Sequence, residues 1–288
     1  MDYMKKYQKM ISLRNLSDHT KKSYTTYLKT YLEFLELIHK YPSQVTIKDL
    51  QKYVIWLKET KHLADRTINA AISQLRFFTI YVLGKSWDPS AVPMRKFDTY
   101  LPFVPTQAEV QEFISTIPDI RVKAMVAVMY SSGLRIGEVC HLRYEDIERK
   151  NMRIHITHSK NRSDRYAMMS KLALDLLTKY WFECGRPMGY LFPQKKDPYK
   201  PVDTFYLSRH IHAHEDRLGW PRRLTCHSFR HAYGTHLYEN GTDLYTIKAL
   251  MGHKSLNSTL IYVHLSVGGN ISAKSPLDLM EGITDGKN

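Results

Sequence analysis

The 288-residue sequence predicts a mainly α-helical protein with a small antiparallel β-sheet, arranged as two domains. Apolar residues recur at helical spacing along most of the chain, one stretch at 152–156 alternates instead, and a proline-rich stretch separates an all-helical N-terminal part from the rest. No apolar run approaches the roughly 20 residues needed to span a bilayer, so a membrane protein is excluded.

A helical bundle is expected over residues 1–88. Thr46 and Asp49 form a capping-box pattern before a second helix, and Asp65 is expected to cap a third helix that stops at Gly84. The first helix is predicted between residues 17 and 40 from a stripe of apolar residues with lysines opposite: Tyr24, Tyr27, Leu28, Tyr31, Leu32, Leu35 and Ile38.

Residues 89–105 predict an extended linker because they contain four prolines and show no periodicity. A second domain, residues 106–288, then begins with a capping box formed by Thr106 and Glu109. Further helical patterns cover 108–117, 120–133, 135–142, 170–183, 203–218, 226–239 and 243–251.

A β-hairpin interrupts the helices of the second domain. Met152, Ile154 and Ile156 alternate, and a polar turn at 160–164 precedes another short strand. Lys160 is therefore expected near the tip of a hairpin.

The net charge points to a large anionic partner. Lys and Arg exceed Asp and Glu by 42 to 28, or +14, with +8 on residues 1–104 (17 against 9) and +6 on the remainder (25 against 19). Because both parts are basic, nucleic acid is the first partner to consider. The three cysteines have no CxxC spacing, and the N-terminus lacks the apolar core of a signal peptide, so we expect reduced thiols in a cytoplasmic protein.

Several short motifs could carry chemistry, although each has an ordinary alternative. "SSGLRIGEV" places Arg135 at a helix start with Glu138 one turn later, which alone fits a surface ion pair. Lys160 shares its turn with Arg162 and Arg165, as a solvated loop would. "HSFRHAYGTHL" sets His227 and Arg230 on one helix face, and "LMGHKSLNSTLIYVH" places His253 at a helix end nine residues before Tyr262.

Metal binding by these histidines is disfavoured. His227 and His231 have zinc-ligand spacing, but the residue after His227 is Ser228 rather than a glutamate that could act as a base. His210, His212 and His214 fit a solvated or DNA-facing helix better. We therefore expect no metal and no cofactor.

The order and spacing of these motifs resemble the tyrosine recombinase (phage integrase) family over nearly the whole chain. The resemblance implies a SAM-like helical core-binding domain followed by an α+β catalytic domain, closing around DNA as a C-shaped clamp. It implies metal-independent breakage and rejoining of DNA strands at a specific site through a 3′-phosphotyrosyl intermediate. The catalytic residues that it implies are Arg135, Lys160, His227, Arg230, His253 and Tyr262.

The resemblance gives each of these residues a role. Tyr262 is the nucleophile, Arg135 and Arg230 hold the phosphate, and Lys160 protonates the leaving 5′-oxygen. His227 helps to accept the proton of the phenol, His253 donates a hydrogen bond to the phosphate, and Glu138 orients the cluster. Phosphate contacts are expected from Lys21, Lys22, Lys29, Arg66 and Arg162.

The family also implies an assembly and a range of biological settings. A homotetramer on two double-stranded DNA sites is expected, linked by the tail after Tyr262, in the cytoplasm at the nucleoid, and accessory proteins are candidate partners. The ending "SVGGNISAKSPLDL" resembles integron integrases, but the stretch before the His-x-x-Arg motif is too short for their inserted helical segment. A transposon, phage or integron-like element is the favoured setting, and a resolvase of chromosome or plasmid dimers is the alternative.

Three other classes of protein stay open. A relative that binds DNA without cleaving it would use the same motifs as a phosphate-binding surface. A type IB topoisomerase shares the arginine, lysine, histidine and tyrosine chemistry but has no site preference. A metal-dependent nuclease would need carboxylates around divalent ions, and the acidic pairs Glu145–Asp146 and Glu215–Asp216 lie in ordinary helical contexts.

Overall fold

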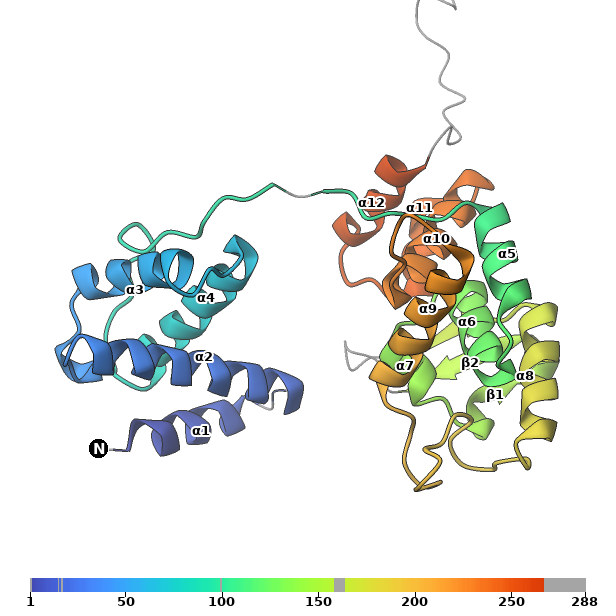
Figure 1. Cartoon of the computed structure of the whole chain (residues 1–288), viewed down its shortest axis with the longest axis horizontal. Helices are drawn as coiled ribbons and strands as arrows, with labels where there is room; N and C mark the ends of the chain where they lie inside the picture. The colour runs from blue at the N-terminus through green and yellow to red at the C-terminus, as the bar shows by residue number, and fades with distance from the viewer. Residues whose placement is uncertain (1, 15, 17, 99, 158–163, 267–288) are drawn as a thin grey trace, which may run out of the picture. The chain divides into compact units, whose positions relative to one another are not determined.

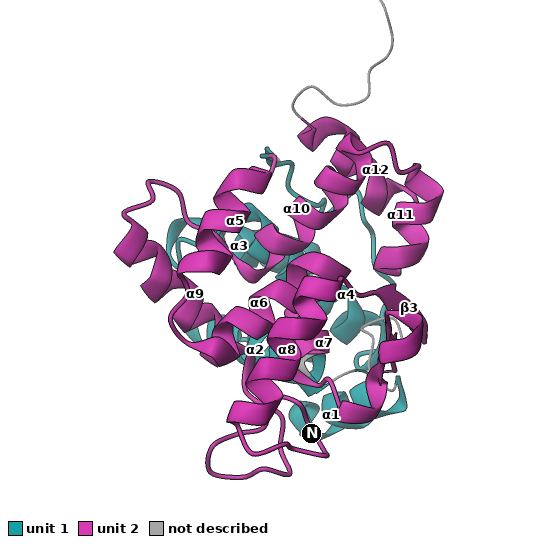
Figure 2. Ribbon diagram, turned by 90° about the vertical axis from the view of Figure 1, so that its right-hand side faces the viewer, with its two compact units in different colours: residues 1–100 teal, residues 101–288 magenta. Residues whose placement is uncertain are grey.

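The computed structural model describes residues 2–14, 16, 18–98, 100–157 and 164–266 (Figure 1). Two compact units, residues 1–100 and residues 101–288, make up the chain (Figure 2). Helices dominate both units, and a small antiparallel sheet lies in the second, so the predicted fold class is confirmed. No helix in the described part of the chain is long and apolar enough to cross a membrane.

Unit 1 is a helical bundle around an aromatic core. The rings of Tyr31 and Tyr53 meet edge to face with centroids 5.1 Å apart, and both are almost fully buried. The predicted capping box is present, because the Asp49 carboxylate accepts from the Thr46 backbone N–H at 2.9 Å. The helices of unit 1 are α1 Tyr3–Leu13, α2 Asp18–Leu37, the 3-10 turn η1 Pro42–Gln44, α3 Ile47–Glu59 and α4 Asp65–Tyr81.

Two features of unit 1 differ from the sequence prediction. Asp65 is the first residue of α4 and not its cap; Ala64 occupies the cap position without a side-chain hydrogen bond. The Asp65 carboxylate instead binds Lys58 and Arg95, which are stronger partners for a charge than a backbone N–H. Helix α1 was not predicted, although Tyr3, Met4, Tyr7, Met10 and Ile11 recur at helical spacing and pack on the core of the bundle.

The chain after α4 stays attached to unit 1 as far as Arg95. Val92 is buried in the core of the bundle, and the side chain of Asn69 exchanges two hydrogen bonds with the backbone of Arg95, at 2.8 and 2.9 Å. The first part of the segment 89–105 therefore packs on the bundle although it has no regular secondary structure.

Unit 2 contains a three-stranded antiparallel sheet in the order β1–β2–β3, with Ile156 opposite Arg165 in the register of β2 and β3. The strands are β1 Ile147–Glu148, β2 Arg153–Ile156 and β3 Arg165–Met168. The helices are α5 Gln107–Thr116, α6 Ile120–Ser132, α7 Ile136–Cys140, α8 Lys171–Glu183, α9 Thr204–Leu218, α10 Cys226–Glu239, α11 Leu244–Met251 and α12 Asn257–Leu265, with 3-10 turns η2 Tyr144–Asp146 and η3 Arg149–Asn151.

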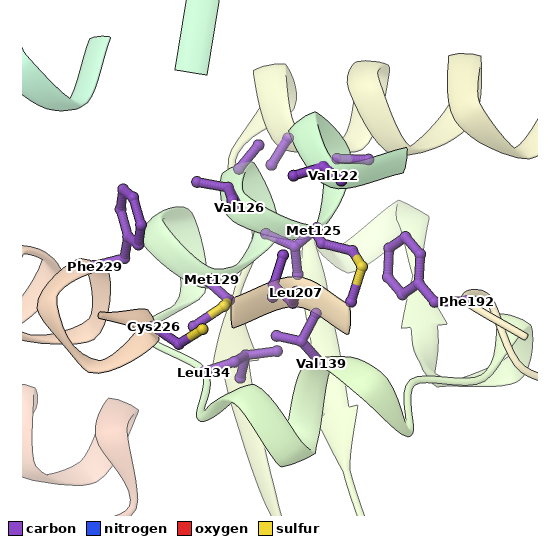
Figure 3. Close-up of a cluster of buried hydrophobic side chains, with 14 of the residues drawn as sticks. Val122, Met125, Val126, Met129, Leu134, Val139, Phe192, Leu207, Cys226 and Phe229 are labelled. Atoms are coloured by element: carbon purple, nitrogen blue, oxygen red, sulfur yellow. The ribbon is translucent and has the colours of Figure 1, made fainter. Parts of the chain in front are cut away.

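Helix α6 forms the centre of the unit 2 core. It is apolar on all sides, as expected for a helix without a solvent face, and it packs against α8 and α10. Leu207 of α9 lies beside Met125 and Met129 of α6 in this core (Figure 3). The cysteines are free thiols, as predicted, with Cys140 and Cys226 buried.

One expectation about the histidines of helix α9 is wrong. His212 is exposed, but His214 is buried, with Nε2 hydrogen bonded to the Phe113 carbonyl at 3.2 Å and to Thr116 Oγ1 at 3.0 Å. Burial lowers the pKa of His214, so it is a neutral packing residue and not part of a solvated or DNA-facing surface.

Candidate active site

Arg230 of α10 joins two helix ends through its guanidinium group. Nη2 donates to the Met251 carbonyl at 2.7 Å, at the end of α11, and Nη1 donates to the Gly133 carbonyl, at the end of α6. Helix C-terminal carbonyls lack intrahelical partners and carry partial negative charge, so they suit a buried cation. Arg230 is only 4% exposed. Burial, followed by the charge of Arg135, lowers its pKa to about 10, which still leaves it cationic at neutral pH.

Gly133 allows this anchoring because no other residue fits there. Its φ is +61°, in the left-handed region, and a Cβ would lie 2.3 Å from the Tyr233 ring. The chain therefore turns sharply between α6 and Arg135. This turn brings the Gly133 carbonyl to Arg230 and places Arg135 at the start of α7.

Arg135 and the buried Glu138 form an ion pair at the start of α7. The Glu138 carboxylate accepts from the Arg135 backbone N–H at 2.9 Å and from Arg135 Nη1 at 2.8 Å. The Glu138 side chain is 2% exposed, so the surface ion pair that the motif alone suggested is wrong. Burial opposes the charge of this carboxylate, but hydrogen bonding and the charge of Arg165 outweigh it and hold its pKa below the usual value.

His253 follows Gly252, the left-handed cap of α11, and is held by α12. Its Nδ1 lies 2.9 Å from the hydroxyl of Thr259, which is fully buried. Burial, and then the charges of Arg230 and Arg135, lower the pKa of His253 to about 4, so the ring is neutral at pH 7. If the Thr259 hydroxyl donates to Nδ1, the Nε2 atom carries the proton and can donate to an anion.

Tyr262 lies in α12 between the His253 ring and α10. Its ring is nearly parallel to that of His253, at 20°, with centroids 6.1 Å apart. On the other side it contacts Gly234, where a Cβ would be 2.5 Å from the phenol Cζ. Burial raises the pKa of Tyr262 to about 12, although Arg230 and Arg135 act in the opposite direction. The phenol therefore needs a proton acceptor to become a nucleophile.

His231 approaches the same phenol from α10. Its ring centroid lies 6.1 Å from that of Tyr262 and 6.4 Å from that of His227. Among the described residues its buried Nδ1 has no hydrogen-bond partner, and burial lowers its pKa to about 4. Within the same residues, no group of three or more His, Cys, Asp or Glu side chains is arranged to hold a metal ion.

The structure thus brings Arg135, Glu138, Arg230, His253 and Tyr262 together from α7, α10, α11 and α12; Figure 2 shows α10, α11 and α12 side by side in unit 2. His227 is exposed near the start of α10. Lys160 and Arg162 lie outside the described residues. Of the predicted phosphate contacts in unit 1, Lys22, Lys29 and Arg66 are exposed, and Lys21 is hydrogen bonded to Asp18 at 3.1 Å.

Sequence reasoning missed residues that support the site. Thr259 and Gly234 lie inside the quoted motifs but carry no charge, and only the contacts described above assign them a role. Arg165 was noted as part of a basic turn, but its side chain is 9% exposed and binds Glu138 through both terminal nitrogens. Its position as the first residue of a strand beside a basic turn was the only signal in the sequence.

If Tyr262 is the nucleophile that the family resemblance implies, replacing Thr259 with valine should slow its reaction with DNA about 10-fold, because the change removes one hydrogen bond that orients the His253 ring. Single-turnover cleavage of a DNA site measures this effect. Thr259→Ser keeps the hydroxyl and should retain the wild-type rate. Equal rates for the valine and wild-type proteins would show that this contact does not orient His253.

Replacing Gly234 with alanine should displace the Tyr262 ring, because the new methyl would lie 2.5–2.7 Å from three of its ring carbons. Overpacking of this kind typically costs about 1–3 kcal/mol, and we expect covalent complex formation to fall at least about 10-fold while DNA affinity is kept. Gly189→Ala is the matched control, since nothing lies within 4 Å of a Cβ there. A Gly234→Ala protein as active as this control would contradict the prediction.

Acidification should destabilise unit 2 through His231 and His253. Their folded-state pKa values of about 4 lie below the unfolded value of about 6.5, so the unfolded chain binds protons first as the pH falls. The stability contribution of the two histidines is complete above about pH 6.5 and is lost toward pH 4, by roughly 1 kcal/mol per histidine at pH 5 because solvent screens these half-buried rings. Urea unfolding of His231→Asn should show a weaker pH dependence than wild type, whereas the exposed His212→Asn should not.

Comparisons with known proteins identify the family of this chain. Residues 104–268 match the Phage integrase family, and residues 3–89 match the phage integrase N-terminal SAM-like domain. The chain is 33% identical over 234 residues, 81% of this chain and 92% of the relative, to y4eF of Sinorhizobium fredii, whose name places it among integrases and recombinases. It is 26% identical to the tyrosine recombinase XerA of Thermococcus onnurineus, over 99% of this chain and 98% of the relative.

A solved structure shows the same fold. The Tn1549 transposon integrase, in complex with circular intermediate DNA, matches with a TM-score of 0.73 at 20% identity, over 91% of this chain and 95% of that one. Because both parts of the chain match phage integrase family models and a relative is 33% identical over 81% of the chain, the chain belongs to the phage integrase family.

Proposed function

We propose that this protein is a site-specific DNA recombinase that cleaves and rejoins DNA strands through a phosphotyrosine at Tyr262. The observation that carries the proposal is the arrangement of Arg230, which is anchored to the helix ends beside Arg135 and His253, while its own helix supports the Tyr262 ring. Two fixed guanidinium groups beside a phenol suit the charge of a phosphodiester undergoing attack.

The reaction replaces one phosphodiester bond with another, so the free energy of that bond is conserved. Tyr262 Oη attacks the scissile phosphorus, the bond from phosphorus to the 5′-oxygen breaks, and the 3′ end stays joined to the phenol. The leaving oxygen takes up a proton as the phenol loses one. Attack by another strand's 5′-hydroxyl then reverses these steps and releases Tyr262.

Each remaining residue has a part in these steps. Arg135 and Arg230 stabilise the negative charge on the non-bridging oxygens, and the neutral His253 donates to the same phosphate from Nε2. His227 accepts the phenol proton, and Lys160 supplies the proton to the 5′-oxygen. Glu138 orients Arg135. No metal is needed in this scheme because the arginines provide the positive charge.

Double-stranded DNA at a recombination site is the partner of both units. Lys21, Lys22, Lys29 and Arg66 of unit 1, and Arg162 of unit 2, supply phosphate contacts in this proposal. With a net charge of +14, affinity should decrease steeply with salt, because each neutralised phosphate releases counterions. Binding to chromosomal DNA would place the protein in the cytoplasm at the nucleoid.

We further propose a homotetramer on two DNA sites, linked by residues 268–288, which lie outside the described residues. Sedimentation of the protein on its DNA site tests this. Removal of the tail should leave protein on single sites, whereas persistence of the tetramer would contradict the role of the tail. Any accessory protein would act on this assembly.

A mobile element is the favoured setting, with dimer resolution as the alternative, and the relatives include both a transposon integrase and XerA. The two settings differ in the DNA they act on. Sequencing the DNA that the protein captures distinguishes them, because element ends flank an inserted segment whereas a resolution site occurs once per replicon.

Covalent trapping tests the chemistry. A DNA site with a nick beside the scissile phosphate loses the short 5′-hydroxyl strand after cleavage, so the covalent complex accumulates. In EDTA, the wild-type protein should form a complex that survives denaturation, and mass spectrometry should find the nucleotide on the peptide that contains Tyr262. Binding without a covalent complex would favour a silent DNA-binding relative. Relaxation of plasmids that lack the site would favour a topoisomerase.

A further inference from the structure

Arg165 occupies an unusual position at the first residue of β3. Nη1 donates to Glu138 Oε1 at 3.0 Å, Nη2 donates to Glu138 Oε2 at 2.7 Å, and Nε donates to the Leu250 carbonyl at 3.3 Å. All three guanidinium nitrogens of a side chain only 9% exposed are therefore bound to protein. A solvated residue of a basic turn would be exposed and would not form these three hydrogen bonds.

The guanidinium group of Arg165 forms a bidentate ion pair with the Glu138 carboxylate. Both carboxylate oxygens accept from it, and Arg135 is left with Nη1 on Oε1 and its backbone N–H on Oε2. Among the described residues, no other guanidinium nitrogen of Arg135 is hydrogen bonded, and its side chain is 20% exposed. Arg135 therefore keeps donors available while Glu138 is fully satisfied.

Gly252 brings a third segment to the same arginine. Its φ is +63°, and a Cβ there would lie 2.7 Å from Arg165 Cδ. The end of α11 can therefore pack directly on the Arg165 side chain. His253 is the next residue, so Arg165 connects β3, the start of α7 and the segment that carries His253.

We propose that Arg165 is a positioning residue that keeps the guanidinium group of Arg135 available for the scissile phosphate. A buried carboxylate that loses a bidentate partner is left with unsatisfied oxygens and takes the nearest donor. Here that donor is Arg135, whose fork would turn from a single contact to a bidentate pair with Glu138 and away from DNA. The proposal rests on the proposed function and names a residue that serves it.

The first experiment compares Arg165→Gln with wild type on the nicked DNA site. We expect the glutamine variant to form the covalent complex about 100-fold more slowly, the size of effect seen when one oxyanion donor is lost, with DNA affinity unchanged. Arg165→Lys keeps the charge but cannot bind both oxygens, so it should also be slow. Arg153→Gln on β2, which removes a half-exposed arginine paired with Glu148, is the matched control and should be as fast as wild type.

A methylphosphonate at the scissile position separates positioning from general damage. One non-bridging oxygen becomes a methyl group, so the transition state carries less charge for Arg135 to stabilise. For at least one of the two stereoisomers, Arg165→Gln and wild type should cleave within about threefold of each other. A defect of equal size on both substrates would overturn the proposal, because a damaged fold slows every substrate.

A double variant tests the competition directly. Glu138→Gln removes the carboxylate that would capture Arg135, so Arg165→Gln should slow a Glu138→Gln protein much less than it slows the wild type. An Arg165→Gln defect of the same size in both backgrounds would overturn the proposal. If Arg165→Gln does not fold, as judged by thermal unfolding, Arg165→Lys replaces it in both comparisons. Absence of a covalent complex with wild type would instead refute the proposed function.

Discussion

Phenylalanine at position 262 should abolish the covalent DNA complex and all strand exchange. The substitution removes a single oxygen, the one expected to become bonded to phosphorus, and no other group can replace it as a reversible leaving group. We expect no complex above background on the nicked DNA site, at any pH. Denaturing gels measure the complex, and joint products from two DNA sites measure exchange.

The same variant should fold and bind DNA normally. The ring of Tyr262 packs between His253 and Gly234, and phenylalanine keeps those contacts, so the free energy of unfolding should change by about 1 kcal/mol or less. Tyr245→Phe, at an exposed tyrosine of α11, is the matched control and should be fully active. Strand exchange by Tyr262→Phe at the wild-type rate would refute both the nucleophile and the mechanism built on it.

Replacement of Arg230 by lysine should reduce cleavage by about 100- to 1,000-fold, the loss expected when a fixed donor to the transition state is removed. The planar fork of Arg230 holds the Met251 and Gly133 carbonyls at once, and a lysine ammonium cannot reproduce that geometry. Lysine keeps the positive charge but does not hold it at the same position relative to Tyr262 and the phosphate. Single-turnover cleavage at saturating protein isolates this effect from DNA binding.

Stability should also decrease in Arg230→Lys. A buried carbonyl left without a donor costs about 1–3 kcal/mol, so urea unfolding should show a loss of that order. Arg209→Lys, at an exposed position on α9, should change neither the rate nor the stability. If Arg230→Lys cleaved DNA as fast as this control, the anchored guanidinium group would not be the charge that holds the phosphate.

Local sequence patterns were enough for most secondary structure. The capping boxes at Thr46–Asp49 and Thr106–Glu109 form as predicted, because each depends on residues only three apart. The patterns failed where partners were distant, as at Asp65, which binds Arg95 thirty residues away, or where the element was short, as for β1.

The candidate site was also only partly predictable from the sequence. The order and spacing of the motifs around Arg135, Arg230, His253 and Tyr262 identified the family from the sequence alone, since the residues that contact a phosphate must be of particular chemical types. Their environment could not be predicted from the same motifs. Glu138 looked like half of a surface pair, and Arg165 looked like a solvated residue of a turn.

The sequence by itself determined the fold class and the family, and it predicted which side chains react, because all three depend on periodicity and on residue chemistry. Only the tertiary structure decided which groups surround them. Contacts such as Arg165 with Glu138, Thr259 with His253, and Gly234 with Tyr262 join elements that are distant or differently oriented along the chain. Burial and charge at those contacts set the pKa values of Arg230, His253 and Tyr262, and neither can be calculated before the chain has folded.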